Sequence, residues 1–222
     1  MRLVMMFAAA LLIGHSTFAE RSQSGGGVPS PGTIDPRQRA VEDYQSGGRR
    51  LDKIAEMYEK LAATSDAKGE EKLKKQIDKQ LKNAEADFRR AVKGRPDLYP
   101  ALSELGFVLR KQGRFEESLE AYDQALAIEP GYSPAIEYRA EAHLALNRIG
   151  EAREAYTILF SGDRPRADVL FAAMKRWVEQ RRTDPAGVEA TELEQFASWV
   201  ETRDAIHQQT SSLTSSSTVR SW

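Results

Sequence analysis

A spacing of 34 residues relates three stretches of this chain, and it limits the possible folds more than any other feature. The pattern is a small residue, an aromatic residue four positions later, and a third residue three positions further on. It occurs at Ala84, Phe88 and Ala91, at Ser118, Tyr122 and Ala125, and at Ala152, Tyr156 and Leu159. A fixed period of 34 residues indicates stacked helical hairpins, because one hairpin alone leaves an apolar stripe on each helix uncovered.

A second series with the same period places the first helix of each hairpin. It runs through Leu102, Gly106 and Leu109, then Ile136, Ala140 and His143, then Leu170, Met174 and Trp177. Between the two helices, Gly113 corresponds to Asn147, and both residue types are suited to tight turns. The periodicity therefore predicts an all-α fold, a short solenoid of antiparallel helix hairpins.

The stretch from Tyr99 to Tyr132 carries the fullest motif. Its pattern is Leu102-x2-Leu105-Gly106-x2-Leu109, then Ser118-x3-Tyr122-x2-Ala125, then Pro130. This pattern resembles a tetratricopeptide repeat. Leu102, Leu109 and Ser118 differ from the commonest residues of that family but keep the size class that each position needs. The resemblance implies a tetratricopeptide-like binding scaffold and does not identify its ligand.

The helical domain is expected to span residues 37–207. Central repeats are expected at about 65–98, 99–132 and 133–166, followed by a closing hairpin at 167–207 whose aromatic residues seal the stack. Residues 37–64 contain a helical pattern broken at Gly47-Gly48 and a second helix, and whether they form a true repeat stays open. The Ser- and Thr-rich stretch 208–222 is expected to be a disordered tail.

Residues 1–19 have the three regions of a secretory signal peptide. Arg2 precedes an apolar run at residues 3–13, and small and polar residues lead to Ala19, after which we expect cleavage. The run is too short to span a bilayer comfortably, and an uncleaved N-terminal anchor is the alternative. Residues 20–36 are rich in Gly, Ser and Pro and are expected to form a flexible leader. These features predict an exported bacterial protein, periplasmic or secreted.

Charge and cysteine content exclude several classes of function. The formal net charge of the chain is −1, so the total suggests neither nucleic acid nor an anionic membrane as a partner. The chain has no cysteine, which excludes disulfides, thiol catalysis and thiolate metal sites. Beyond the N-terminal run, no apolar segment of the sequence is long enough to span a membrane.

Signals of catalysis are poor. His15 leaves with the signal peptide, and His207 lies at the end of the last expected helix. His143 takes the place of Leu109 in the 34-residue series, so we expect it to be a partly buried packing residue. The sequence has no Gly-rich phosphate loop after a strand, no HExxH and no GxSxG motif. We therefore predict a protein that is not an enzyme and holds no metal or cofactor.

The resemblance to tetratricopeptide repeats implies that a partner binds along the first helix of each hairpin, on the concave face. Carried onto this sequence, the non-core positions of those helices are Ser103, Phe107, Arg110, Lys111, Glu137, Tyr138 and Glu141. The family's clamp for a C-terminal carboxylate uses Lys and Asn where this chain has Ser103 and Phe107, so that clamp is expected to be absent. Phe107 and Tyr138 are open to two interpretations, as anchors for a peptide or as residues that pack against the next hairpin.

Charge is distributed unevenly along the chain. Residues 68–95 include ten basic and five acidic residues, whereas acidic residues outnumber basic ones between 114 and 154. The lysine-rich helix face in the first of these segments is expected to be solvated. Opposite charge at the two ends of a solenoid would promote head-to-tail association or steer a partner.

These observations predict an adaptor or scaffold of the cell envelope that binds a partner protein or peptide in the concave groove. The alternatives are a self-assembling structural scaffold and a non-catalytic subunit of an envelope enzyme complex. Export argues against nucleic acid as the partner.

Overall fold

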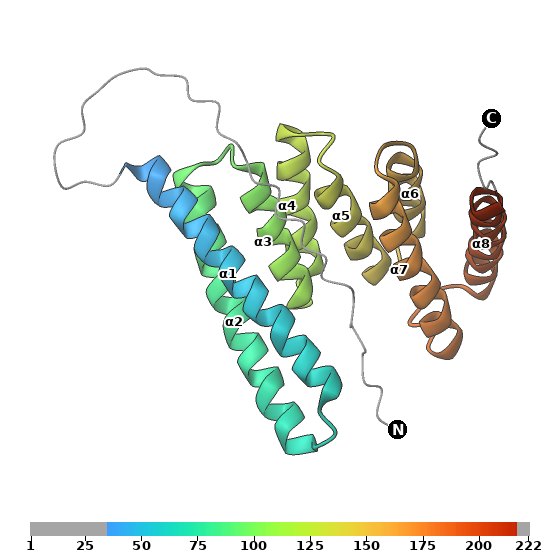
Figure 1. Ribbon diagram of the computed structural model, residues 1–222, viewed down its shortest axis with the longest axis horizontal. Coiled ribbons are helices and arrows are strands. Elements are labelled where there is room, and N and C mark those ends of the chain that lie inside the picture. The colour runs from blue at the N-terminus through green and yellow to red at the C-terminus, as the bar shows by residue number, and fades with distance from the viewer. Residues whose placement is uncertain (1–34, 217–222) are drawn as a thin grey trace. The chain divides into compact units, whose positions relative to one another are not determined.

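The computed structural model describes residues 35–216, and within this range it holds eight α-helices and no strand (Figure 1). The helices are α1 (Pro36–Ala63), α2 (Ala67–Gly94), α3 (Tyr99–Lys111), α4 (Phe115–Ile128), α5 (Ser133–Ala145), α6 (Ile149–Gly162), α7 (Arg164–Thr183) and α8 (Ala190–Ser216). This confirms the all-α class. None of the helices in the described part of the chain is long and apolar enough to cross a membrane. The expected signal peptide, 1–19, lies outside the described residues, as does nearly all of the leader.

The helices form two compact units that divide inside α4, between Glu117 and Ser118. The first unit is dominated by α1 and α2, which have 28 residues each, whereas α3 to α6 have 13 or 14. The two long helices form an antiparallel hairpin, because Asp43 contacts Arg90 while Arg50, one helix segment later, contacts Gln80. The segment 65–98 was predicted to be a repeat of its own, but it holds the single helix α2, whose partner is α1.

Helix α1 begins at Pro36 and continues through Gly47-Gly48, where the sequence predicted a break. The reason is the close approach of α2. A Cβ atom built on Gly47 would lie 2.5 Å from Cε1 of Phe88, whose ring is fully buried. Because no side chain fits between the two helices at this level, the glycine serves close packing and not a turn.

A buried carboxylate joins α1 to α2 beside this contact. Asp87, 3% exposed, accepts hydrogen bonds from Ser46 Oγ at 2.9 Å and Arg50 Nε at 2.7 Å, and it also pairs with Arg90. Burial alone raises the pKa of Asp87, but the hydrogen bonds from Arg50, Ser46 and Arg90 outweigh it and hold the pKa below its usual value. The carboxylate therefore stays ionised, and its contacts fix the register of the hairpin.

Burial confirms the 34-residue register at the second-helix positions, all of which are 2% exposed or less: Ala84, Phe88, Ala91, Ser118, Tyr122, Ala125, Ala152, Tyr156 and Leu159. The turn positions also correspond, since Gly113 has φ 78° and Asn147 has φ 58°. Asn147 is held there by its side chain, which donates to the carbonyl of Ala186 at 3.0 Å and accepts from Arg181 at 2.9 Å. The asparagine thus links the α5–α6 turn to α7 and to the loop after it.

The second unit closes with an aromatic cluster between α7 and α8. The Trp177 indole donates to the carbonyl of Leu144 at 2.6 Å and meets Phe196 edge-on, with 5.5 Å between ring centroids. Phe196 in turn stacks on Trp199 at 5.8 Å. These rings cover the apolar faces that α5, α6 and α7 leave open, as a terminal element of a repeat stack must.

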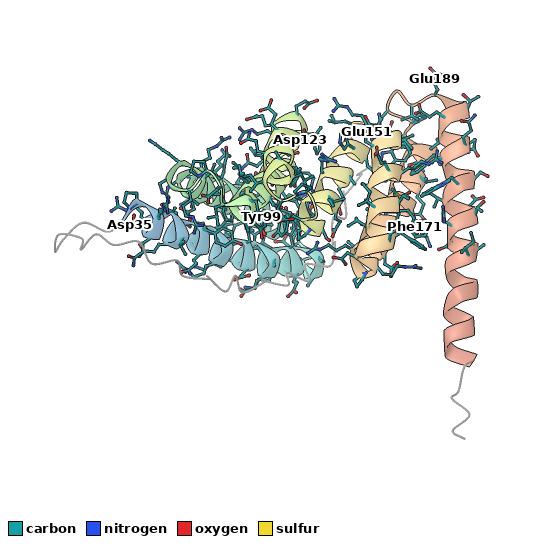
Figure 2. All side chains as sticks on the ribbon, turned by 90° about the horizontal axis from the view of Figure 1, so that it is seen from above. Asp35, Tyr99, Asp123, Glu151, Phe171 and Glu189 are labelled. Atoms are coloured by element: carbon teal, nitrogen blue, oxygen red, sulfur yellow. The ribbon has the colours of Figure 1, made fainter. Side chains whose placement is uncertain are left out.

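Helix α8, which follows the loop at Glu189, continues to Ser216 (Figure 2). The expected disordered tail, 208–222, is therefore helical over its first part, and residues 217–222 lie outside the described residues. The stretch from His207 to Ser216 contains no Gly or Pro that would end a helix.

Replacing Gly47 by Ala should destabilise the protein, although alanine favours helices. Overpacking of the buried Phe88 ring costs about 1–3 kcal/mol, against about 1 kcal/mol gained in helix propensity. Gly150→Ala is the matched control, because nothing lies within 4 Å of a Cβ built on that helical glycine. Urea unfolding should show a loss for Gly47→Ala and a neutral or slightly positive effect for Gly150→Ala. Equal gains in both variants would contradict the close approach of α1 and α2.

Asn147 separates the effect of backbone conformation from that of its side-chain contacts. Asn147→Gly loses only the contacts to Ala186 and Arg181, whereas Asn147→Ala also forces an alanine to positive φ, at about 1–2 kcal/mol. The alanine variant should therefore unfold at lower urea concentration than the glycine variant, by a free energy of about 1 kcal/mol or more. Gly113→Ala tests the same strain in the turn one period earlier. If the two Asn147 variants were equally stable, the left-handed turn would be wrong.

Candidate functional site

The seven residues predicted to contact a partner are divided between the two units. Ser103, Phe107, Arg110 and Lys111 lie on α3 in the first unit, and Glu137, Tyr138 and Glu141 lie on α5 in the second unit. Each group forms its own cluster with residues of neighbouring helices.

In the first unit, two cations of α3 gather around one aromatic ring. The Arg110 guanidinium and the Lys111 ammonium each lie 5.4 Å from the centroid of the Phe107 ring. They reach it because residues three and four positions apart share one side of a helix. The Lys111 ammonium also lies 6.0 Å from the ring of Tyr58 on α1. The structure therefore brings together three of the four predicted residues and adds Tyr58.

The residues of this first cluster differ in accessibility. Ser103, Phe107 and Arg110 are buried, at 1%, 7% and 8% exposed, while Lys111 and Tyr58 are half-buried. Burial raises the pKa of the Tyr58 hydroxyl and Asp78 adds to this, while Arg110 opposes it, so the phenol stays neutral. A partner would meet the ammonium of Lys111 and the side of Tyr58, with Phe107 and Arg110 beneath them. Phe107 thus takes the packing interpretation in this conformation.

In the second unit, Glu137 joins α5 to α7 and is not presented to a partner. It is 3% exposed, and its carboxylate accepts from Arg166 Nη1 at 2.6 Å. Burial opposes the charge of Arg166, but Glu137 and Tyr138 outweigh this effect and raise the pKa of the guanidinium. Ionised, hydrogen-bonded and buried, the pair has the character of a structural contact.

Tyr138 and Glu141 are the accessible members of the second group. Both are half-buried. The Tyr138 ring lies 6.3 Å from the ring of Tyr122 and 5.7 Å from the Arg166 guanidinium. The side of α5 that carries them therefore combines an aromatic ring, a carboxylate and a nearby cation, a mixture suited to a peptide with an apolar side chain and mixed charge.

Two members of these clusters were not among the predicted site residues. Tyr58 appeared in the sequence only as part of an apolar stripe, and Arg166 lies 29 residues after Glu137, at the start of another helix. Neither position falls in the 34-residue series from which the first-helix positions were taken. The pairing of helices is what brings them to the site.

No catalytic or metal centre emerges from the part of the chain that the structure describes. It contains no group of three or more His, Asp or Glu residues placed to hold a metal ion. His143 is half-buried, as expected for a packing residue, and burial lowers its pKa, so the imidazole is neutral at pH 7.

Comparison with known families finds a tetratricopeptide repeat at residues 99–132. These are the bounds predicted from the sequence, and the presence of the repeat is confirmed. Such repeats generally act in protein–protein interaction, through the surfaces that stacked hairpins create.

A relative from Solanum lycopersicum is described as a probable UDP-N-acetylglucosamine–peptide N-acetylglucosaminyltransferase, SPINDLY. The two sequences are 30% identical over 139 residues. The aligned part is 56% of this chain and 15% of the relative. The chain is thus similar to one limited part of a much longer protein.

Proposed function

We propose that this chain is a non-catalytic binding module that holds a protein or peptide partner, and that it works in the cell envelope after export. The tetratricopeptide repeat at residues 99–132 is the observation that carries this proposal. The residues of its consensus are consumed by packing, which leaves the intervening positions of the first helix to meet a partner. The expected signal peptide at residues 1–19 supports the envelope as the location.

The accessible residues of the two clusters suggest the chemistry of the partner. In the first unit, Lys111 and Tyr58 favour a segment that carries an acidic residue next to an apolar one, because an ammonium and a ring can contact both. In the second unit, Tyr138 and Glu141 favour an apolar or basic residue. Tyr residues are common among the residues that dominate binding energy at interfaces. An extended or helical peptide can offer both kinds of contact.

The tomato relative supports a second candidate function. Its name describes an enzyme that acts on peptides, which agrees with a peptide as the bound partner. This chain is similar to 15% of that protein, so a non-catalytic part of an enzyme complex is the form of this candidate that the similarity favours. A self-assembling scaffold is the remaining alternative.

Photo-crosslinking in cells should identify the binding surface. A benzophenone amino acid placed at Lys111 or Tyr138 should capture one and the same partner, whereas placement at the exposed Glu120 or Glu154 should capture none. With the partner purified, Lys111→Glu and Tyr138→Ala should each weaken binding roughly tenfold, as expected for residues worth 1–2 kcal/mol at an interface. Glu154→Gln is the control for binding.

The identity of the captured protein separates the alternatives. An envelope protein supports the proposal, and an enzyme among the captured proteins supports the second candidate. Capture of a second copy of this chain favours the scaffold, and a cytoplasmic partner would contradict export. Equal capture from all four positions would show that these faces of α3 and α5 are not the binding surface.

Glu137 should behave as a structural residue and not as a contact for a partner. Glu137→Gln leaves the mostly buried Arg166 guanidinium facing a neutral amide, and we expect a loss of about 2 kcal/mol in the free energy of unfolding. Glu154→Gln, on an exposed position, should change it by less than about 0.5 kcal/mol. Partner binding well below the melting temperature should be unchanged in both. Loss of binding by Glu137→Gln at unchanged stability would return Glu137 to the binding surface.

A further inference from the structure

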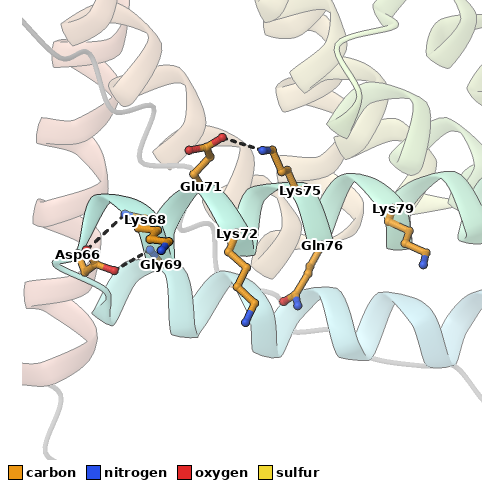
Figure 3. A pocket seen from close by; sticks show the side chains of 8 residues that line it. All are labelled: Asp66, Lys68, Gly69, Glu71, Lys72, Lys75, Gln76 and Lys79. Carbon is orange, nitrogen blue, oxygen red and sulfur yellow. Dashed lines mark hydrogen bonds and ion pairs between the residues drawn. The ribbon is translucent and has the colours of Figure 1, made fainter.

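The outer side of α2 carries a continuous row of five lysines: Lys68, Lys72, Lys75, Lys79 and Lys82, here called the lysine face. At 3.6 residues per turn these positions fall within a sector of about 80° and extend over about 21 Å. Between residues 68 and 82 this sector contains no other residue type. All five side chains are exposed. Figure 3 shows four of them projecting from the helix along a shallow groove.

The lysine face points away from the core of the hairpin. The buried residues Ile77, Leu81 and Ala84 lie on the opposite side of α2, towards α1. Among the described residues only Lys75 of the lysine face has an ion-pair partner, Glu71 at 2.7 Å. Most of this positive charge is therefore not neutralised within the protein.

The other outer side of the same hairpin provides a comparison. The exposed residues of α1 that face away from α2 have mixed charge: Glu42, Arg49, Lys53, Glu56 and Lys60. A face that only keeps a helix soluble has this mixed character. The lysine face has a single sign over its whole length, so solubility alone does not account for it.

We propose that the lysine face of α2 docks on an anionic phospholipid membrane. A straight row of cations on a projecting hairpin is complementary to a planar array of phosphate headgroups. The sequence favours this occupant, since the export signal expected at residues 1–19 takes the chain to a membrane. Clusters of four to eight basic residues are typical of such docking, with each lysine strengthening binding roughly fivefold.

The choice of lysine supports a loose, electrostatic contact over a specific protein or nucleic-acid partner. Arginine forms bidentate contacts of defined geometry, and this chain uses it for internal ion pairs such as Arg50–Asp87 and Arg166–Glu137. Lysine is a hydrated point charge that tolerates mobile headgroups. The sector holds no aromatic residue on which a base could stack and no apolar anchor for a protein hot spot.

Two features of the chain do not oppose this docking. The net charge of −1 belongs to the whole chain, but at physiological salt a charge is felt over about 8 Å, so the local row decides what it attracts. The N-terminus of α2 is already capped by Asp66, which accepts from the backbone N–H of Gly69 at 2.7 Å. The contact with lipid therefore rests on the lysine side chains.

Binding of the full-length chain to vesicles tests the proposal. The face variant carries Lys72→Gln, Lys75→Gln and Lys79→Gln. The control variant loses the same charge elsewhere, through Lys53→Gln and Lys60→Gln on the far side of the hairpin and Lys74→Gln, which lies off the lysine face. All six positions are exposed, so both variants should melt within a few degrees of the unmodified protein.

Sedimentation with vesicles of equal parts phosphatidylglycerol and phosphatidylcholine should show binding of the unmodified chain that disappears when salt is raised from 0.05 to 0.3 M. The face variant should bind on the order of 100-fold more weakly, and the control variant should lose less than about threefold. Vesicles of phosphatidylcholine alone should bind none of the three proteins.

Several results would overturn the proposal. Equal losses in both variants would mean that total charge decides, and no loss in either would exclude the lysine face. Salt-insensitive binding to phosphatidylcholine would assign binding to the apolar residues 3–13. If the face variant lost binding to polyglutamate or to duplex DNA while vesicle binding was unchanged, the lysine face would serve an acidic protein or a nucleic acid instead.

Discussion

The fold depends on the close approach of helices at positions spaced 34 residues apart. A helix of 13 or 14 residues is marginal by itself in water, so it must cover its apolar stripe with a neighbour. Small residues such as Ala84 and Ala125 allow that neighbour to come close, and the aromatic residues Phe88, Tyr122 and Tyr156 fill the space that remains. Burying one such ring contributes about 1.5–3 kcal/mol. At Gly47 the approach is so close that even a methyl group is excluded.

This constraint also decides where function can lie. Packing consumes the consensus positions, and the long side chains between them are used in part to join neighbouring helices. Glu137 pairs with Arg166 across α5 and α7, and Arg110 lies over Phe107 within α3. The positions that stay half-exposed are few: Lys111 with Tyr58 in one unit and Tyr138 with Glu141 in the other. Specificity for a partner would have to come from these residues.

The periodic part of the structure could be predicted from the sequence, because the packing constraint repeats in it. The burial of Ser118 and Ala152 and the left-handed turn at Asn147 followed from the offset alone. Gly47-Gly48 could not be interpreted in this way, since glycine serves both as a helix breaker and as a site of close approach. Which of the two applies depends on Phe88, which lies on another helix. The burial of Glu137 was hidden for the same reason, because it depends on Arg166.

The long first hairpin is where the chain departs most from the repeat. Its two helices are about twice the length of α3 to α6, and hairpin packing requires an apolar stripe on each but leaves their outer sides free. Those outer sides differ: α1 mixes both signs of charge, whereas α2 has five lysines in one row. Since packing does not dictate that difference, it reflects what the hairpin meets in solution. A module that docks on a lipid surface through α2 would hold its repeat near the membrane, where a partner embedded in or bound to that membrane is concentrated.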